Sequence, residues 1–107
     1  IEGSYEEAEK IYMRMEKENY ENAEFLLGDF YSEQKKYTEA EKYYLKGIEK
    51  YGRKLRLLFG LATVYKEQER YKEAKEIYEE LKSSKDKSIK EMAEKNLKEL
   101  GRENNYE

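Results

Sequence analysis

The chain contains no proline, cysteine, tryptophan or histidine, and these absences exclude several classes of function. Without cysteine there is no disulfide framework, thiolate nucleophile or iron–sulfur cluster. Without histidine the chain lacks the commonest metal ligand and the commonest general base. No apolar run approaches the ~18 residues that would span a membrane, and no secretory pattern opens the chain. We therefore expect no metal, no cofactor and no membrane partner.

Charged residues are abundant, yet their signs nearly balance. The 107 residues include 22 basic and 25 acidic ones, which gives a net charge of −3. Leu, Ile, Val and Phe are few, as in disordered chains, but disorder by composition requires a large net charge. Twelve tyrosines add further apolar area, and Ala, Leu, Glu, Lys and Arg all favour helices. The composition predicts an all-α fold, and the start at Ile1-Glu2-Gly3 suggests a piece of a longer protein.

An internal repeat is the strongest pattern in the chain. The pattern Tyr-x-x-Ala-x-x-x-Tyr occurs three times, at Tyr5–Tyr12, Tyr37–Tyr44 and Tyr71–Tyr78. Aligning residues 21–54 with 55–88 makes nine of 34 positions identical, including both Phe25/Phe59 and Tyr31/Tyr65. Repeats of this length indicate stacked supersecondary units, each of which buries its apolar face against the next.

Apolar periodicity and local chemistry predict six helices, near residues 4–17, 21–34, 37–51, 54–68, 71–83 and 88–100. Ser4 with Glu7, and Ser88 with Glu91, have the spacing of capping boxes at helix starts. Gly52 and Gly101 follow apolar-periodic stretches, as glycines that end helices do. The short connections predict antiparallel neighbours.

The residues of this repeat resemble those of the tetratricopeptide repeat family. Its pattern of Leu-small-x-x-Tyr on a first helix matches Leu27–Tyr31 and Leu61–Tyr65, and the Tyr, Ala and aromatic residues of a second helix match residues 37–44 and 71–78. The resemblance implies a right-handed α-solenoid of antiparallel helical hairpins over a single domain, residues 1–107. Within it, 4–17 would be the second helix of a partial repeat, 21–54 and 55–88 two repeats, 88–101 a capping helix and 102–107 a tail.

The chain departs from the family pattern at three kinds of position. Glu24 and Leu58 stand where the first helix usually has tryptophan. Gly52 and Asp86 replace the proline that usually closes a repeat. Gly47 and Leu81 occupy second-helix positions where alanine is usual.

The resemblance also implies a groove, lined by first helices, that binds a peptide or helix of another protein. Phe25 and Phe59 would anchor an apolar or amphipathic segment there, while the alternative places both rings in the core between helices. One subclass of the family grips carboxylate-ended chaperone tails, but Asp29 would repel such a tail, so we do not predict that ligand. The matching inward residues are Asn22, Phe25, Asp29, Ser32, Arg56, Phe59, Thr63 and Lys66.

A basic cluster lies around Gly52. Its lysines and arginines could meet an acidic partner or phosphate groups, or they could simply complement the dipole at a helix C-terminus. The acidic chain as a whole argues against nucleic-acid binding. The cluster consists of Lys50, Arg53, Lys54 and Arg56.

The tyrosines divide into core and surface candidates by their place in the repeat. Eight occupy repeat positions that favour packing, and four lie near loops or beside a core position, where tyrosine suits an interface. The core set is Tyr5, Tyr12, Tyr31, Tyr37, Tyr44, Tyr65, Tyr71 and Tyr78, and the surface set is Tyr20, Tyr43, Tyr51 and Tyr106.

Two further classes of function compete with partner binding. Catalysis would have to rest on carboxylates, lysine or tyrosine. The carboxylate pairs, such as Glu6/Glu7 and Glu79/Glu80, are more simply solvated faces paired with lysines, so we do not expect an enzyme. Self-assembly is the other class, because the helix at 4–17 lacks a preceding partner. Its open side predicts either a longer array or a homodimer.

Overall fold

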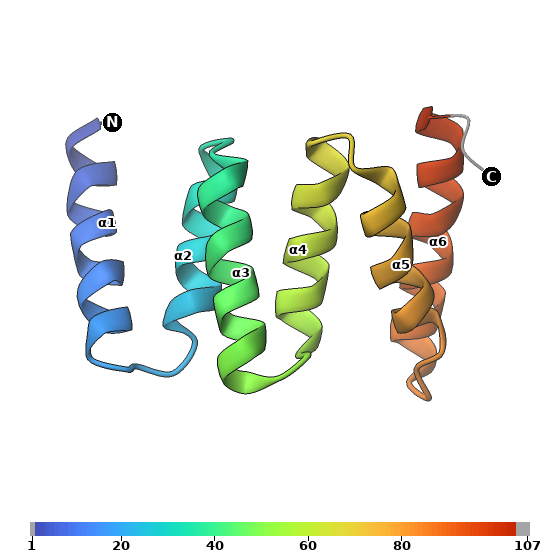
Figure 1. The fold of residues 1–107 in the computed structure, drawn as a ribbon, viewed down its shortest axis with the longest axis horizontal. Coiled ribbons are helices and arrows are strands. Elements are labelled where there is room, and N and C mark those ends of the chain that lie inside the picture. The colour runs from blue at the N-terminus through green and yellow to red at the C-terminus, as the bar shows by residue number, and fades with distance from the viewer. Residues whose placement is uncertain (1, 105–107) are drawn as a thin grey trace. The chain divides into compact units, whose positions relative to one another are not determined.

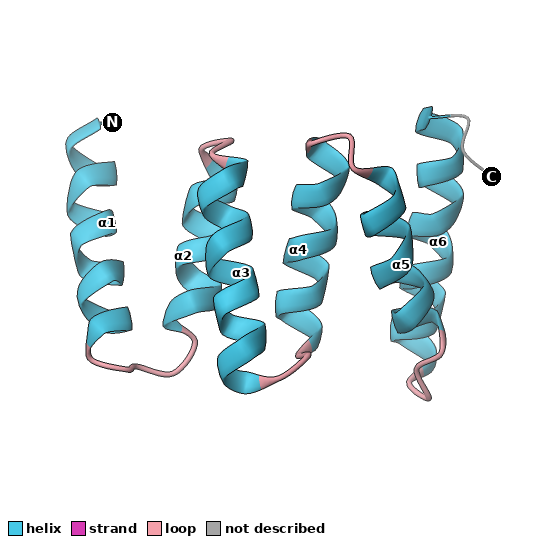
Figure 2. Ribbon diagram, viewed as in Figure 1, coloured by secondary structure: helices cyan, strands magenta, loops and turns pink. Residues whose placement is uncertain are grey.

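The computed structural model describes residues 2–104, and within this range the chain forms six helices and no strand (Figure 1). The predicted all-helical repeat is therefore confirmed. Short loops join the helices (Figure 2). The helices are α1 (Glu2–Lys17), α2 (Ala23–Glu33), α3 (Tyr37–Tyr51), α4 (Leu55–Glu67), α5 (Tyr71–Lys82) and α6 (Lys87–Asn104).

Three predicted helix boundaries are wrong. Ser4 lies inside α1, which begins at Glu2. The residue that caps α6 is Asp86 rather than Ser88, because the Asp86 carboxylate accepts the backbone N–H groups of Ser88 (2.9 Å) and Ile89 (3.3 Å). Gly101 lies inside α6, since a glycine ends a helix only where the chain turns into a left-handed conformation.

The loops between helices repeat their backbone geometry. Lys35 and Glu69 lie 34 residues apart, just after α2 and α4, and both adopt the left-handed conformation, with φ of 62° and 60°. Their N–H groups donate to Ser32 and Lys66 carbonyls. Gly52 ends α3 as predicted, with φ of 92° and an N–H bond of 2.8 Å to the Ile48 carbonyl.

The chain divides into two compact units, one up to Leu61 and one from Ala62 onward. In the first unit α2 packs against both α1 and α3, and in the second α5 packs against α6. Apolar side chains fill the core of each unit. These are Ala23, Leu27, Tyr31, Ala40, Tyr43, Tyr44, Leu57, Leu58 and Leu61 in the first, and Ala62, Val64, Ala74, Ile77, Tyr78, Leu81, Ala93 and Leu100 in the second.

Tyr44 of α3 lies between two glycines of the first unit, Gly28 on α2 and Gly60 on α4. A Cβ atom built on either glycine would lie 2.5 Å from Tyr44 Cε1, which is far inside van der Waals contact. The absence of a side chain at both positions thus lets α2 and α4 approach the two sides of one buried ring. This is the close approach that the repeat pattern of a small residue near an aromatic predicts.

The tyrosine predictions are partly wrong. Tyr43, expected at the surface, is buried and stacks on Tyr31 with ring centroids 5.7 Å apart. It does so because α1 covers that side of α3, where the Tyr43 hydroxyl lies 3.4 Å from Met13 Sδ. Tyr5, expected in the core, is 50% exposed. Tyr106 lies outside the described residues.

The other core tyrosines are buried or half-buried, and Tyr20 is exposed as predicted. Tyr31 shows how a buried hydroxyl is satisfied, because it donates to Glu9 Oε2 at 2.6 Å. Burial, together with this bond to an anion, raises the pKa of Tyr31 well above its usual range.

Glu24, which stands in the usual tryptophan position, is fully buried in the first unit. Its Oε2 lies 3.4 Å from Lys50 Nζ, while its Oε1 has no hydrogen-bond partner among the described residues. Gly47, another departure from the family pattern, lies beside it, since a Cβ there would be 3.3 Å from Glu24 Cβ. The missing side chain of Gly47 therefore leaves room for Glu24. The counter-charge of the buried Glu24 carboxylate is Lys50.

We predict opposite effects from changing the two ends of this ion pair. Lys50→Met leaves the Glu24 carboxylate buried without its counter-charge, so it should lower the free energy of unfolding. Glu24→Leu replaces the pair with the residue that the second repeat has at this position, Leu58, and should raise that free energy by about 1 kcal/mol. Urea denaturation measures both, with Lys90→Met on α6 as a control for removing an exposed charge. A Glu24→Leu chain less stable than Lys50→Met would contradict this account.

Candidate binding site

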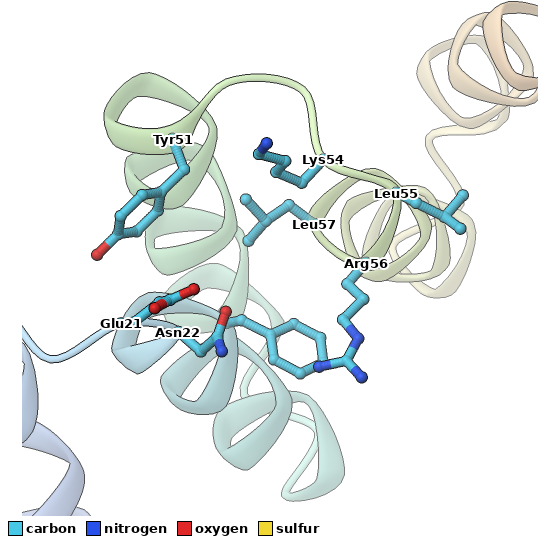
Figure 3. A pocket seen from close by; sticks show the side chains of 8 residues that line it. Glu21, Asn22, Tyr51, Lys54, Leu55, Arg56 and Leu57 are labelled. Atoms are coloured by element: carbon cyan, nitrogen blue, oxygen red, sulfur yellow. The ribbon is translucent and has the colours of Figure 1, made fainter.

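A cavity of about 440 Å³ opens in the first unit where three helix ends meet (Figure 3). It lies between the beginnings of α2 and α4 and the end of α3. It is lined by Glu21, Asn22, Phe25, Tyr51, Lys54, Leu55, Arg56 and Leu57.

Local backbone chemistry brings these ends together. Asn22 precedes α2 in the left-handed conformation, with φ of 69°, and its side chain makes no capping hydrogen bond. Gly52 then turns the chain out of α3, so that Lys54 stands at the beginning of α4 and accepts the Leu58 N–H at 2.9 Å. Only three residues, 52–54, separate α3 from α4, which keeps Tyr51 and Arg56 at the same cavity.

The cavity combines apolar surface with charge. Phe25 is half-buried, and the Arg56 guanidinium lies over its ring at 5.2 Å from the centroid, a cation–π arrangement. Leu57 also lines the cavity and is buried. It fills the space left by the missing side chain of Gly47, whose built Cβ would lie 2.8 Å from Leu57 Cδ2. Such a surface can hold an apolar group and a polar one at once.

Three of the eight predicted site residues meet at this cavity, namely Asn22, Phe25 and Arg56. Phe25 and Phe59 are both half-buried. Neither ring therefore lies fully in the core between helices or fully on the surface. Along α4, helical spacing places Phe59, Thr63 and Lys66 on the same face as Arg56, with Thr63 exposed and the other two half-buried.

Asp29 and Ser32 continue the face of α2 beyond Phe25, and both are half-buried. The Asp29 carboxylate accepts a hydrogen bond from the Tyr44 hydroxyl. Burial, and then this bond, raise the pKa of Tyr44 far above its usual range. The bond also ties Asp29 to the ring that lies between Gly28 and Gly60.

Five lining residues were not among the predicted set, although the repeat register contains a signal for most of them. Glu21 aligns with Leu55, and Asn22 aligns with Arg56, so the cavity is lined by the same two positions of both repeats. Lys54 belongs to the basic cluster and Tyr51 to the surface tyrosines named above. Lys50 of that cluster is directed elsewhere, to Asn19 (3.0 Å) and Glu24 (3.4 Å).

A second cavity of about 340 Å³ lies in the second unit, lined by Lys82, Glu94, Leu97 and Lys98 of α5 and α6. Among the described residues, no group of acidic side chains is arranged to hold a metal ion. None of the described helices is long and apolar enough to cross a membrane.

Comparison with known proteins supports the repeat pattern. A family model for the tetratricopeptide repeat matches residues 19–83, the segment that contains α2 to α5. No curated protein and no solved structure matches the chain. Members of this family generally mediate protein–protein interaction or scaffolding, and they are typically non-catalytic. The match covers more than half of the chain and coincides with its helical repeats, so the chain belongs to the tetratricopeptide repeat family.

Proposed function

We propose that this chain is a non-catalytic interaction module that binds a peptide or helix of a partner protein along α2 and α4. The cavity at the beginnings of these helices is the observation on which the proposal rests. Its volume of about 440 Å³ is that of a small-ligand pocket and can hold a bulky side chain. Arginine and aromatic residues at its rim are the types that dominate binding energy at interfaces.

The rest of the proposed surface continues from this cavity along two helix faces. Phe25 would act as the apolar anchor, and polar residues on either side would hold the backbone and set the direction of the bound segment. Within the first unit the proposed surface consists of Asn22 just before α2, Phe25, Asp29 and Ser32 on α2, and Arg56 and Phe59 on α4. The same face of α4 continues to Thr63 and Lys66.

Replacing the anchor should abolish partner binding while the fold survives. We expect Phe25→Ser to lose a partner that the parent chain captures, because the serine removes the aromatic surface beneath Arg56. Met92→Ser is the matched control, since Met92 is an exposed apolar side chain of α6 (43% exposed). Affinity capture followed by mass spectrometry compares the three chains, and thermal unfolding verifies that each is folded.

Identical captured proteins for parent and Phe25→Ser would contradict the proposed site. A large fall in the melting temperature of Phe25→Ser would instead assign the ring to the core, where truncating a buried Phe costs about 3–5 kcal/mol.

A second candidate function is self-assembly through α1. Ile11 occupies the position of Tyr43 and Ile77 in the repeated pattern. Those two residues are buried at 6% and 5% exposure, whereas Ile11 is 56% exposed. The side of α1 that would meet a first helix of its own repeat is therefore uncovered in the first unit. A second copy of the chain, or a longer array of repeats, would cover it.

This candidate predicts concentration-dependent association. Sedimentation velocity or multi-angle light scattering at increasing concentration should show a dimer for the parent chain. Ile11→Glu should be a monomer throughout, because a dimer would bury its charge. Leu45→Glu, at another exposed apolar position (43%), should associate like the parent. A strictly monomeric parent would rule out the dimer.

A further inference from the structure

We infer that the cavity between α2, α3 and α4 selects partner segments in which a bulky apolar side chain lies beside an acidic side chain. The inference rests on the proposed function and names the chemistry of its ligand. The apolar side chain would enter the cavity over Phe25 and Leu57, and the carboxylate would meet Arg56, while Lys54 adds positive charge to the lining.

Charge at the rim is the first argument. The chain as a whole has a net charge of −3, yet the cavity is lined by two cationic side chains, Lys54 and Arg56, and one anionic side chain, Glu21. Among the described residues, neither Lys54 nor Arg56 pairs with a carboxylate of the chain. The cationic groups are thus available to a carboxylate of a partner, and such charge complementarity favours specificity.

The position of Glu21 gives the bound segment a direction. In Figure 3 the Glu21 carboxylate lies on the Tyr51 side of the cavity, and the Arg56 guanidinium lies on the opposite side. A ligand carboxylate would therefore be attracted to the Arg56 side and repelled from the Glu21 side. The acidic side chain of the partner should lie toward α4.

The apolar part of the ligand follows from the ring beneath Arg56. The guanidinium already covers one face of Phe25 at 5.2 Å, so a carboxylate bound to Arg56 is held close to apolar surface. An arginine stacked on a ring is pre-oriented for a bidentate bond to a carboxylate. An acidic residue without an apolar neighbour would leave the cavity empty and would lose the area that Phe25 and Leu57 offer.

We assign the carboxylate to a side chain of the partner rather than to a chain terminus. Asp29 lies one helical turn beyond Phe25 on the same face of α2, and its carboxylate is held there by the Tyr44 hydroxyl. A terminal carboxylate that bound farther along this face would be repelled by Asp29. A segment that continues past the cavity can instead place a neutral or basic residue there.

Selection from a display library of random peptides, none with a free C-terminus, tests the inference. The library is first depleted on Phe25→Ser and then selected on the parent chain. We expect the enriched peptides to share a bulky apolar residue with Asp or Glu close to it. An excess of Lys or Arg beside the apolar residue would overturn the inference and leave the proposed function intact. No enrichment over Phe25→Ser would overturn both.

The best enriched peptide, made with an amidated C-terminus, then serves as the probe in fluorescence anisotropy. Arg56→Gln should weaken binding about tenfold, as expected for the loss of one charge-assisted bond, and Lys54→Gln should weaken it less, because Lys54 acts on the carboxylate from a greater distance. Changing the acidic residue of the peptide to its amide should have the same effect as Arg56→Gln. Glu21→Gln should strengthen binding, and Lys90→Gln on α6 is the control that should change nothing.

Two results of this assay would overturn the inference. One is unchanged affinity in Arg56→Gln. The other is a peptide that binds only with a free C-terminal carboxylate, because the ligand would then be a chain end. Raising the salt concentration should weaken the parent complex more than the Arg56→Gln complex.

Discussion

The contact on which the first unit depends is the close packing of the Tyr44 ring between Gly28 and Gly60. Interiors pack at nearly crystalline density, so a ring can contact two helix backbones only where side chains are missing. This contact holds α2 and α4 on either side of α3. Because both helices begin at the same end of α3, it also brings Asn22, Phe25 and Arg56 to a single cavity. The hydroxyl of the same ring donates a hydrogen bond to the Asp29 carboxylate. Tyr44 therefore both packs the core and positions a residue of the proposed binding surface.

The buried Glu24 alters the electrostatics around this framework. Its ion pair with Lys50 directs this member of the basic cluster to Glu24 rather than to the cavity. Lys54 and Arg56, two other members of the cluster, line the cavity. An ion pair with one buried partner is weak evidence for stability, because the desolvation of Glu24 offsets the attraction between the charges. A second ion pair, Glu16 with Lys46 at 2.5 Å, links α1 to α3, and this bond lowers the pKa of Glu16. Stability from Glu16 is therefore present at neutral pH and lost as the carboxyl is protonated in acid.

The repeat register made much of the fold predictable from the sequence. The spacing of Tyr37, Ala40 and Tyr44 predicted the helix and its buried face, and the same register placed Asn22, Phe25 and Arg56 on first helices. Other features depend on three-dimensional context. Tyr43 is buried because α1 covers it, and Asp86 caps α6 because its carboxylate reaches two amides. Leu57 packs closely against α3 because Gly47 leaves room for it. Local patterns do not record which neighbour covers a side chain, and the cavity depends on that.

A double-mutant cycle on Gly60 and Tyr44 tests the central claim most directly. If the ring fills the space at Gly60, Gly60→Ala should lower the free energy of unfolding by about 1–3 kcal/mol, the usual cost of overpacking. In a Tyr44→Leu background the same change should be neutral or stabilising, since alanine favours a helix over glycine by about 1 kcal/mol. An equal effect of Gly60→Ala in both backgrounds would show that the two residues are uncoupled and would contradict the account.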